Sequence, residues 1–353
     1  MGHVTHGQNL QKNIASDPAI DAQWVLPAWE AGGIAGLIPN WTLRAGWQAR
    51  QGIAALQRQA SLDALFFHTQ VTAVLAVNWI KKIPSIISLD ATPRQYDELG
   101  EFYAHDPGPA WLENWKWQLN RNAFQAARHI VTWSEWAKKG LVREYEVPAE
   151  KITVIPPGVN MQDWRRLQPR VTLTKAPVKL LFVGGNLERK GGFILLEAFR
   201  SLKTMLANEQ PGLEIELHLA TKDQVKEEPG LFVYNNMQPN SAPLKKLYHD
   251  CDIFCLPTYG DCLPMVLSEA AAAGLPTIST NVAAIPEVTV DGKTGFIIPP
   301  GDVHALVQAL KKLVVDAKFR QQQGEQAVEY VQQKFDAQAN AVRLLELLKE
   351  TAN

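Results

Sequence analysis

Apolar runs the length of a β-strand recur along the chain, separated by segments whose apolar residues have helical spacing. Some of these runs, such as LFVY and IFCL, are apolar throughout and others are interrupted by only one or two polar residues, which is typical of parallel strands buried on both faces of a sheet. Strands that alternate with helices indicate an α/β fold built from doubly wound parallel sheets. The predicted strands are Leu62–His68, Pro84–Leu89, His129–Trp133, Ile152–Ile155, Val178–Val183, Glu214–Ala220, Leu231–Tyr234, Ile253–Leu256, Leu275–Ser279 and Gly295–Ile298.

Length, charge and cysteine content limit the possible domain organisation, partners and cellular location of the protein. The length of 353 residues favours two domains, each with its own core. A net charge of −1 provides no global attraction to nucleic acid. No apolar run reaches the roughly 18–20 residues that span a bilayer, and no signal peptide precedes the first helix-like segment, so we expect a cytoplasmic protein. Cys251, Cys255 and Cys262 are odd in number and close in sequence, and we expect reduced thiols.

The stretch Tyr259–Pro286 combines a turn, a helix and a strand around two carboxylates. Pro264 suits the first turn of the helix and Gly274 ends it. A helix N-terminus offers partial positive charge and unpaired N–H groups to an anion. Asp261 and Glu269 beside such a terminus suit a sugar held by its hydroxyls next to a phosphate. The alternative interpretation is a capping Asp and an exposed helical Glu.

This stretch resembles the Glu-x7-Glu signature of the retaining glycosyltransferases of family GT4, which an AxAxGLP-like run follows. Here it reads Asp261-x7-Glu269 within PMVLSEAAAAGLP, so Asp replaces the first Glu. The resemblance implies that Glu269 holds the donor ribose and Asp261 the sugar hydroxyls. Cys262, Leu263 and Pro264 would complete the donor-binding loop, with backbone groups from the last two. Because Asp is one methylene shorter than Glu, either the loop lies closer to the sugar or the accepted sugar changes.

The resemblance also implies a GT-B fold, in which two doubly wound Rossmann-like domains face a cleft. The expected parts are an acceptor-binding domain over 1–166, a linker over 167–177, a donor-binding domain over 178–334, and a C-terminal helix over 335–353 that crosses back to the first domain. No strand precedes the segment MGHVTHGQNLQKNI, so we expect the first strand of the N-terminal domain to be missing from this chain. Gly2, His3 and His6 would lie in a loop near the acceptor and the donor phosphates; the alternative is a pair of solvated histidines.

A glycine-rich loop follows the predicted strand Val178–Val183. Gly184 and Gly185 open the loop GGNLERKGG, which enters a helix, and Arg189 and Lys190 add positive charge. A strand, a glycine loop and a helix N-terminus together form a phosphate cradle. The loop resembles the GT4 diphosphate site, except that Gly185 occupies the place of the family's Arg and Arg189 is the nearby replacement. The alternative is a flexible basic turn.

Two further segments concern how the donor is bound. Asn235 and Met237 follow a predicted strand and, by position in such a fold, face the nucleotide base. Asp250 and Asp252 form a DxD pattern, but they precede an apolar strand, so we expect no metal site there. We therefore expect no cofactor, with the phosphates neutralised by the two basic side chains of the glycine loop and the helix dipole.

The first half carries the candidate acceptor residues. Asp90 follows the strand Pro84–Leu89, where open α/β sheets bind ligands, and GT4 members often have a His or Asp at this place near the transferred sugar. The alternative is an Asp that caps the turn before Pro93. All eleven tryptophans precede residue 165. Trp111 and Trp115 share a helical face that would stack on a sugar acceptor or rest in a membrane interface; the alternative is core packing.

These observations predict a retaining glycosyltransferase that moves a sugar from a UDP- or GDP-sugar to an acceptor hydroxyl. The acceptor is a glycan, a lipid-linked molecule or a small molecule, and nucleic acid is not expected as a partner. A peripheral position at the inner membrane face would place the N-terminal domain on the bilayer. Two alternatives remain: another reaction on the same fold, such as that of an NDP-sugar epimerase or a phosphorylase, and a catalytically silent protein that binds nucleotide sugars.

Overall fold

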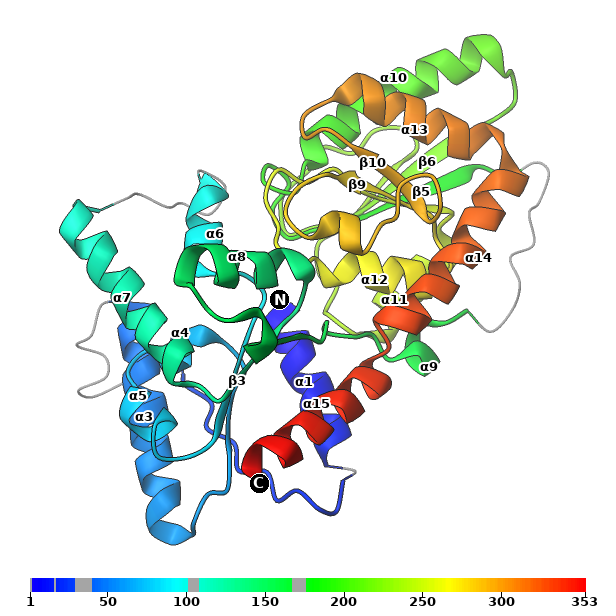
Figure 1. The fold of residues 1–353 in the computed structure, drawn as a ribbon. Coiled ribbons are helices and arrows are strands. Elements are labelled where there is room, and N and C mark those ends of the chain that lie inside the picture. The colour runs from blue at the N-terminus through cyan, green and yellow to red at the C-terminus, as the bar shows by residue number, and fades with distance from the viewer. Residues whose placement is uncertain (1, 16, 29–39, 101–107, 167–175) are drawn as a thin grey trace. The chain divides into compact units, whose positions relative to one another are not determined.

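The computed structural model describes residues 2–15, 17–28, 40–100, 108–166 and 176–353. The chain forms two compact units, shown in Figure 1. One unit combines Met1–Asn9 with Pro157–Ala337, and the other combines Leu10–Pro156 with Gln338–Asn353. Most of the predicted linker, together with residues 101–107 of the aromatic-rich segment, lies outside the described residues. Each unit is an α/β structure around its own parallel sheet.

The unit that contains Pro157–Ala337 has a six-stranded parallel sheet in the order β10-β9-β8-β5-β6-β7. From β5 the chain proceeds outward to β6 and β7, and then returns to the other side of β5 with β8. The strands β5 and β8 are adjacent, and the loops that follow them lead in opposite directions along the sheet. The point between these loops is therefore the topological switch point of the sheet. The strands are β5 (Val178–Val183), β6 (Ile215–Ala220), β7 (Leu231–Tyr234), β8 (Ile253–Leu256), β9 (Thr277–Thr280) and β10 (Gly295–Ile298).

Helices cover both faces of this sheet. Figure 1 shows α10 and α13 on one side and α11 and α12 on the other. The core-facing residues of α10 recur every three or four positions, as Leu195, Phe199 and Leu202 do, which gives the helix one apolar side. The helices are α9 (Met161–Trp164), α10 (Gly192–Glu209), α11 (Ala242–Asp250), α12 (Met265–Ala272), α13 (Val303–Val315) and α14 (Ala317–Lys334), with a 3₁₀ turn, η3 (Ile285–Glu287).

The unit that contains Leu10–Pro156 has a four-stranded parallel sheet in the order β1-β2-β3-β4. Adjacent residues of a strand point to opposite faces. Ile87 and Ile130 accordingly join the larger core cluster, whereas Ile86 and Val131 pack on the other face against helices from the two ends of the chain. The strands are β1 (Leu65–Phe67), β2 (Ser85–Leu89), β3 (His129–Thr132) and β4 (Ile152–Val154).

The helices at the chain ends reach this sheet through a few leucines and isoleucines. Leu10 and Ile14 of α1 and Leu344 and Leu345 of α15 are buried in the same cluster as Ile86. In this unit Lys349 also pairs with Asp17 at 2.7 Å. The helices are α1 (Gly2–Ile14), α3 (Trp41–Gln59), α4 (Gln70–Ala73), α5 (Val77–Ile80), α6 (Pro93–Glu98), α7 (Ala110–Ala126), α8 (Glu135–Tyr145) and α15 (Ala337–Ala352), with the 3₁₀ turn η2 (Ala149–Lys151).

The N-terminal segment differs from the loop predicted for it. Gly2, His3 and His6 lie within helix α1, because buried positions recur at Asn9, Leu10 and later turns and favour a helix over the flexibility of the glycines. Over the described residues before Leu65, the structure contains helices α1 and α3 and no strand. Between β1 and β2 the chain forms two short helices, α4 and α5. Among the described residues, no helix is both long and apolar enough to cross a membrane.

Candidate functional site

The loops that follow β5 and β8 meet at the switch point of the six-stranded sheet. The backbone N–H of Tyr259 donates to the Arg189 carbonyl oxygen at 2.9 Å, and the Thr258 hydroxyl donates to the same oxygen at 3.1 Å. In return the Arg189 guanidinium donates to the Gly260 carbonyl oxygen at 2.5 Å. Residues far apart in sequence are thus joined by side-chain and backbone hydrogen bonds, and the basic turn predicted from the glycine loop is held in place.

An ion pair between Lys190 and Asp261 closes the contact between these loops. Both side chains are only 14% exposed. Burial, and next the charge of Arg189, lower the pKa of Lys190 to about 7, and the nearby Cys262 side chain opposes this shift. The charged form of Lys190 therefore depends on a negative partner, which is the Asp261 carboxylate in this structure. The predicted phosphate cation and the predicted sugar-binding acid lie in direct contact.

Gly191 allows the two loops to approach each other. Its φ of +73° lies in the left-handed region, and a Cβ placed on it would lie 1.9 Å from the Pro257 carbonyl oxygen. Gly191 is the N-cap of α10, and the amides of Gly191 and Gly192 donate to carbonyl oxygens of the loop itself. The amide of Gly184 likewise donates to Ala220 on β6. The next two backbone amides of α10 belong to Phe193 and Ile194. Neither has a hydrogen-bond acceptor among the described residues.

Asp223 joins the glycine loop to the segment after β7, and sequence reasoning missed it. Its carboxylate accepts the Leu187 N–H at 2.6 Å, and its carbonyl oxygen accepts the Asn235 side-chain N–H at 2.9 Å. Asn235 is therefore linked to the glycine loop through a single residue. Met237 follows on the same segment, after the edge strand β7 and two strands away from β5. Asp223 comes three residues after β6, and this position at a strand end was the available signal.

Glu269 lies in the middle of α12, and its side chain is buried. The Tyr248 hydroxyl of α11 donates to its carboxylate at 3.1 Å. Burial raises the pKa of Glu269 to about 7, with smaller opposing effects from the Tyr248 hydrogen bond and the Lys245 charge. The alternative interpretation of an exposed helical Glu is therefore wrong. Glu269 is thus a buried ionisable group on the helix that follows Asp261, and it is hydrogen-bonded to Tyr248.

The loop between the two acids is ordered by its own backbone. Pro264 is the N-cap of α12, one position earlier than predicted, so Asp261 does not cap this helix. Cys262 and Leu263 are buried, and the Cys262 carbonyl oxygen accepts the Ala284 N–H at 3.1 Å. Among the described residues, Cys251, Cys255 and Cys262 form no disulfide.

The DxD pattern has structural contacts. The Asp252 carboxylate accepts the Lys179 N–H at 2.7 Å and lies 4.0 Å from the Arg320 guanidinium. Asp250 forms an ion pair with Lys246 on the preceding turn. Across the part of the chain that the structure describes, no three His, Cys, Asp or Glu side chains gather in a group that would hold a metal ion.

In the four-stranded sheet, Asp90 follows β2 directly and is buried. The Tyr96 hydroxyl donates to its carboxylate at 2.6 Å. The cap of the next helix is Thr92, whose hydroxyl accepts the Gln95 N–H while the Gln95 side chain accepts the Thr92 N–H, a capping box. Asp90 is therefore not needed as a cap, and the carboxylate lies at the carboxyl end of the strand, as predicted for a ligand-facing position.

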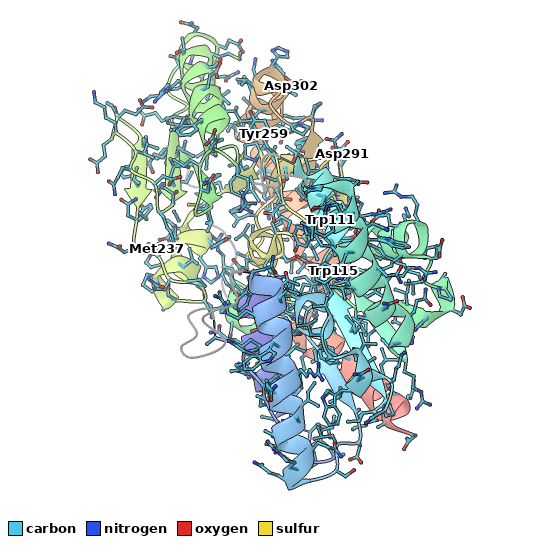
Figure 2. All side chains as sticks on the ribbon, turned by 90° about the vertical axis from the view of Figure 1, so that its left-hand side faces the viewer. Trp111, Trp115, Met237, Tyr259, Asp291 and Asp302 are labelled. Carbon is cyan, nitrogen blue, oxygen red and sulfur yellow. The ribbon has the colours of Figure 1, made fainter. Side chains whose placement is uncertain are left out.

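Trp111 and Trp115 lie one turn apart on α7 and are 72% and 45% exposed. Figure 2 shows both on this helix. They do not pack in the core, so that alternative is wrong for these two residues. The neighbouring Trp117 does pack: its ring stacks on Tyr145, and its N–H donates to the Glu144 carbonyl oxygen at 2.8 Å. Of the N-terminal histidines, His6 is buried and His3 is half-buried, so neither is simply solvated.

Each half of the chain matches the model of a known protein family. A domain described as Glycosyl transferases group 1 matches residues 177–316, and a domain described as Glycosyltransferase Family 4 matches residues 16–163. The first contains the loops after β5 and β8. The second contains Asp90 and α7.

Among characterised relatives, the chain is 28% identical over 235 residues to the capsular polysaccharide biosynthesis glycosyltransferase CapM of Staphylococcus aureus, a match that covers 62% of this chain and 61% of CapM. It is 32% identical over 225 residues to a putative colanic acid biosynthesis glycosyltransferase, WcaL, of Salmonella typhimurium, covering 61% of this chain and 54% of WcaL. The chain thus matches less than two thirds of the length of these relatives.

Solved structures share the fold at low identity. A sucrose-phosphate synthase from Thermosynechococcus elongatus superposes with a TM-score of 0.70 at 16% identity, over 88% of this chain and 78% of the synthase. Anabaena HepE in complex with UDP-glucose superposes with a TM-score of 0.61 at 16% identity, over 85% of this chain and 82% of HepE. These neighbours confirm the GT-B fold class for the two parallel α/β units.

Proposed function

We propose that this chain, whose two halves match the group 1 and family 4 glycosyltransferase domains, transfers a sugar from a nucleotide-diphosphate donor to an acceptor hydroxyl with retention of anomeric configuration. The observation that carries this proposal is the contact between the loops after β5 and β8. It brings a lysine, an arginine, a helix N-terminus and a carboxylate together at the switch point of a parallel sheet. Such a switch point is where open α/β sheets bind ligands.

The chemistry required of this site is stabilisation of a leaving diphosphate. Negative charge grows on the phosphate oxygens as the bond to the sugar breaks, and fixed positive groups lower the energy of that state. Lys190 and Arg189 provide two cations, and the amides of Phe193 and Ile194 provide donors at the positive end of α10. These groups supply the neutralisation without a metal ion, so we expect a metal-independent reaction.

The remaining residues of the site suit the nucleoside and the sugar. Glu269 provides a buried carboxylate for the ribose hydroxyls, and Asp261 provides one for the sugar hydroxyls. Asn235 and Met237 follow β7 at the same end of the sheet and suit contacts to the base. HepE, which shares the fold, was solved with UDP and with UDP-glucose, and this supports a UDP-sugar as the first donor to test.

The acceptor side of the proposal involves the four-stranded unit. The Asp90 carboxylate accepts a hydrogen bond from the Tyr96 hydroxyl, and we propose that it contacts the transferred sugar and that the leaving phosphate deprotonates the acceptor on the same face. The exposed Trp111 and Trp115 suit an acceptor that stacks on aromatic rings, either a glycan or a lipid-linked sugar. An acceptor attached to lipid would place this face at the surface of the membrane on the cytoplasmic side.

The test is release of nucleoside diphosphate from UDP-, GDP- and ADP-sugars, with and without EDTA. We compare wild type, Lys190→Ala and Lys222→Ala, since Lys222 is an exposed lysine that follows the neighbouring strand β6. Removing one group that stabilises developing charge lowers the rate by roughly a hundredfold or more. We expect this loss in Lys190→Ala, near-normal rates in Lys222→Ala, and no effect of EDTA.

Each departure from this result has a definite meaning. Equal rates in both lysine variants would contradict the proposed phosphate site. Loss of activity in EDTA, restored by a divalent cation, would contradict metal independence. Binding of a nucleoside diphosphate without turnover of any sugar donor and acceptor would indicate a silent nucleotide-sugar-binding protein.

A further inference from the structure

Lys190 and Asp261 form an ion pair with each other in this structure. In the proposed reaction, each of them contacts a different part of the donor. Lys190 is the cation best placed for the diphosphate, and Asp261 is the acid expected to hold sugar hydroxyls. Their ion pair engages both charged groups with each other. A bound donor therefore has to replace the Asp261 carboxylate at Lys190 with a phosphate oxygen.

Because the pair is shielded from solvent, replacing the Asp261 carboxylate with a phosphate oxygen at Lys190 changes the free energy of binding. Exposed ion pairs contribute little because water screens them, but here both side chains are 14% exposed. The loops around the pair are fixed by hydrogen bonds between Arg189 and residues 258–260, so neither charge can easily move away into water. Removing one partner of such a pair leaves the other charge buried without a counter-charge.

We propose that Asp261 alternates between two partners during the reaction and thereby drives release of the nucleoside diphosphate. With the intact donor bound, Asp261 accepts hydrogen bonds from the sugar hydroxyls and Lys190 contacts the diphosphate. Once the sugar has left, Asp261 has no hydroxyl to bind and competes with the phosphate for Lys190. The carboxylate is thus an internal competitor of the product, but not of the sugar-bearing donor. This inference rests on the proposed function.

The backbone of the two loops supports this assignment. Asp261 stands where the resembling family has Glu, and its carboxylate reaches Lys190 from the loop after β8. Lys190 in turn is fixed by its place directly before the tightly packed Gly191. The two charged groups are therefore brought together by backbone contacts that do not depend on the ion pair itself.

The test measures binding of the free product, separately from turnover. Calorimetry gives the Kd of UDP, GDP and ADP for wild type, Asp261→Asn, Asp261→Glu and Lys190→Ala, and stopped-flow displacement gives the dissociation rate. Glu188→Gln is the charge control, because it removes a carboxylate from an exposed residue two positions before Lys190. Thermal unfolding of each variant confirms that it is folded.

Asp261→Asn should bind the nucleoside diphosphate roughly tenfold more tightly, chiefly through slower dissociation, since buried charge pairs have coupling energies of this order and act mainly on off-rates. Turnover of the sugar donor should fall in the same variant. Asp261→Glu should retain a product affinity close to that of wild type, and Glu188→Gln should change it little.

The outcomes separate this inference from the proposed function. If Lys190→Ala leaves nucleoside diphosphate binding unchanged, the proposed phosphate site itself fails. If Lys190→Ala weakens binding but Asp261→Asn does not tighten it, the site stands and the competitor role of Asp261 is overturned. Equal tightening by Glu188→Gln would also overturn it, because the effect would then be general electrostatics.

Discussion

The six-stranded and four-stranded sheets place their candidate residues in different ways. In the six-stranded sheet, the groups come from two loops at one switch point, and they contact one another through hydrogen bonds and an ion pair. In the four-stranded sheet, Asp90 lies at a strand end and contacts Tyr96, whereas Trp111 and Trp115 lie on the outer side of a helix. A site built at a switch point is determined by the path of the backbone, and changes there should affect folding and binding together. An exposed helix face should tolerate change.

Gly191→Ala should have the largest effect. Its Cβ would lie 1.9 Å from the Pro257 carbonyl oxygen, and its φ of +73° disfavours any side chain, so we expect the free energy of unfolding to fall by about 3 kcal/mol or more. Nucleoside diphosphate binding should be lost in the protein that remains folded. Urea unfolding and calorimetry measure the two effects.

Gly212→Ala is the matched control for the backbone conformation. Gly212 also has a positive φ, +95°, but a Cβ there would meet nothing within 4 Å. We expect only the cost of the left-handed conformation, about 1–2 kcal/mol, and unchanged binding. Similar losses in the two variants would show that the approach of the loops at Gly191 is not what matters.

Glu269→Gln should have an intermediate effect that depends on pH. Burial raises the pKa of Glu269 to about 7, so the folded protein favours the protonated acid. Its contribution to stability is therefore present below about pH 4.5 and is lost as the pH rises through 7. We expect Glu269→Gln to be more stable than wild type by on the order of 2 kcal/mol at pH 8, and nearly equal to it at pH 4.5.

The measurement is urea unfolding at a series of pH values. Glu197→Gln, on an exposed position of α10, is the control and should show no such pH-dependent gain. A gain for Glu269→Gln that is the same at every pH would contradict the assignment. Donor binding should weaken in the same variant, because the amide cannot replace a carboxylate that accepts bonds from two ribose hydroxyls.

Trp111→Ala and Trp115→Ala should have the smallest effect on stability, within about 0.5 kcal/mol, because exposed residues contribute little to the core. Trp117→Ala on the same helix should cost several times more, since its ring stacks on Tyr145 and its N–H is hydrogen-bonded. If the exposed pair contacts the acceptor, their removal should raise the acceptor KM and leave the donor KM unchanged. An unchanged acceptor KM would contradict the acceptor role.

Sequence patterns predicted the strands well because a parallel strand buried on both faces is a mainly apolar run. Val178–Val183 and Ile253–Leu256 were placed with their observed bounds. The caps Ser134 and Asp302 also follow local chemistry, since each side chain accepts an N–H within its own helix turn. The N-terminal segment was mispredicted because glycine and histidine suggest a loop, whereas the tertiary contacts of Asn9, Leu10 and Ile14 stabilise a helix.

The sequence by itself determined the α/β class, the glycine loop, the spacing of Asp261 and Glu269, and the place of Asp90 after a strand. Each of these depends on residues close together in the chain, where propensity and periodicity are sufficient. Only the tertiary structure decided that Lys190 contacts Asp261, that Asp223 joins two loops, and that Glu269 is buried against Tyr248. Those contacts join residues between 12 and 71 positions apart, and they exist because the order of strands in the sheet brings distant segments together.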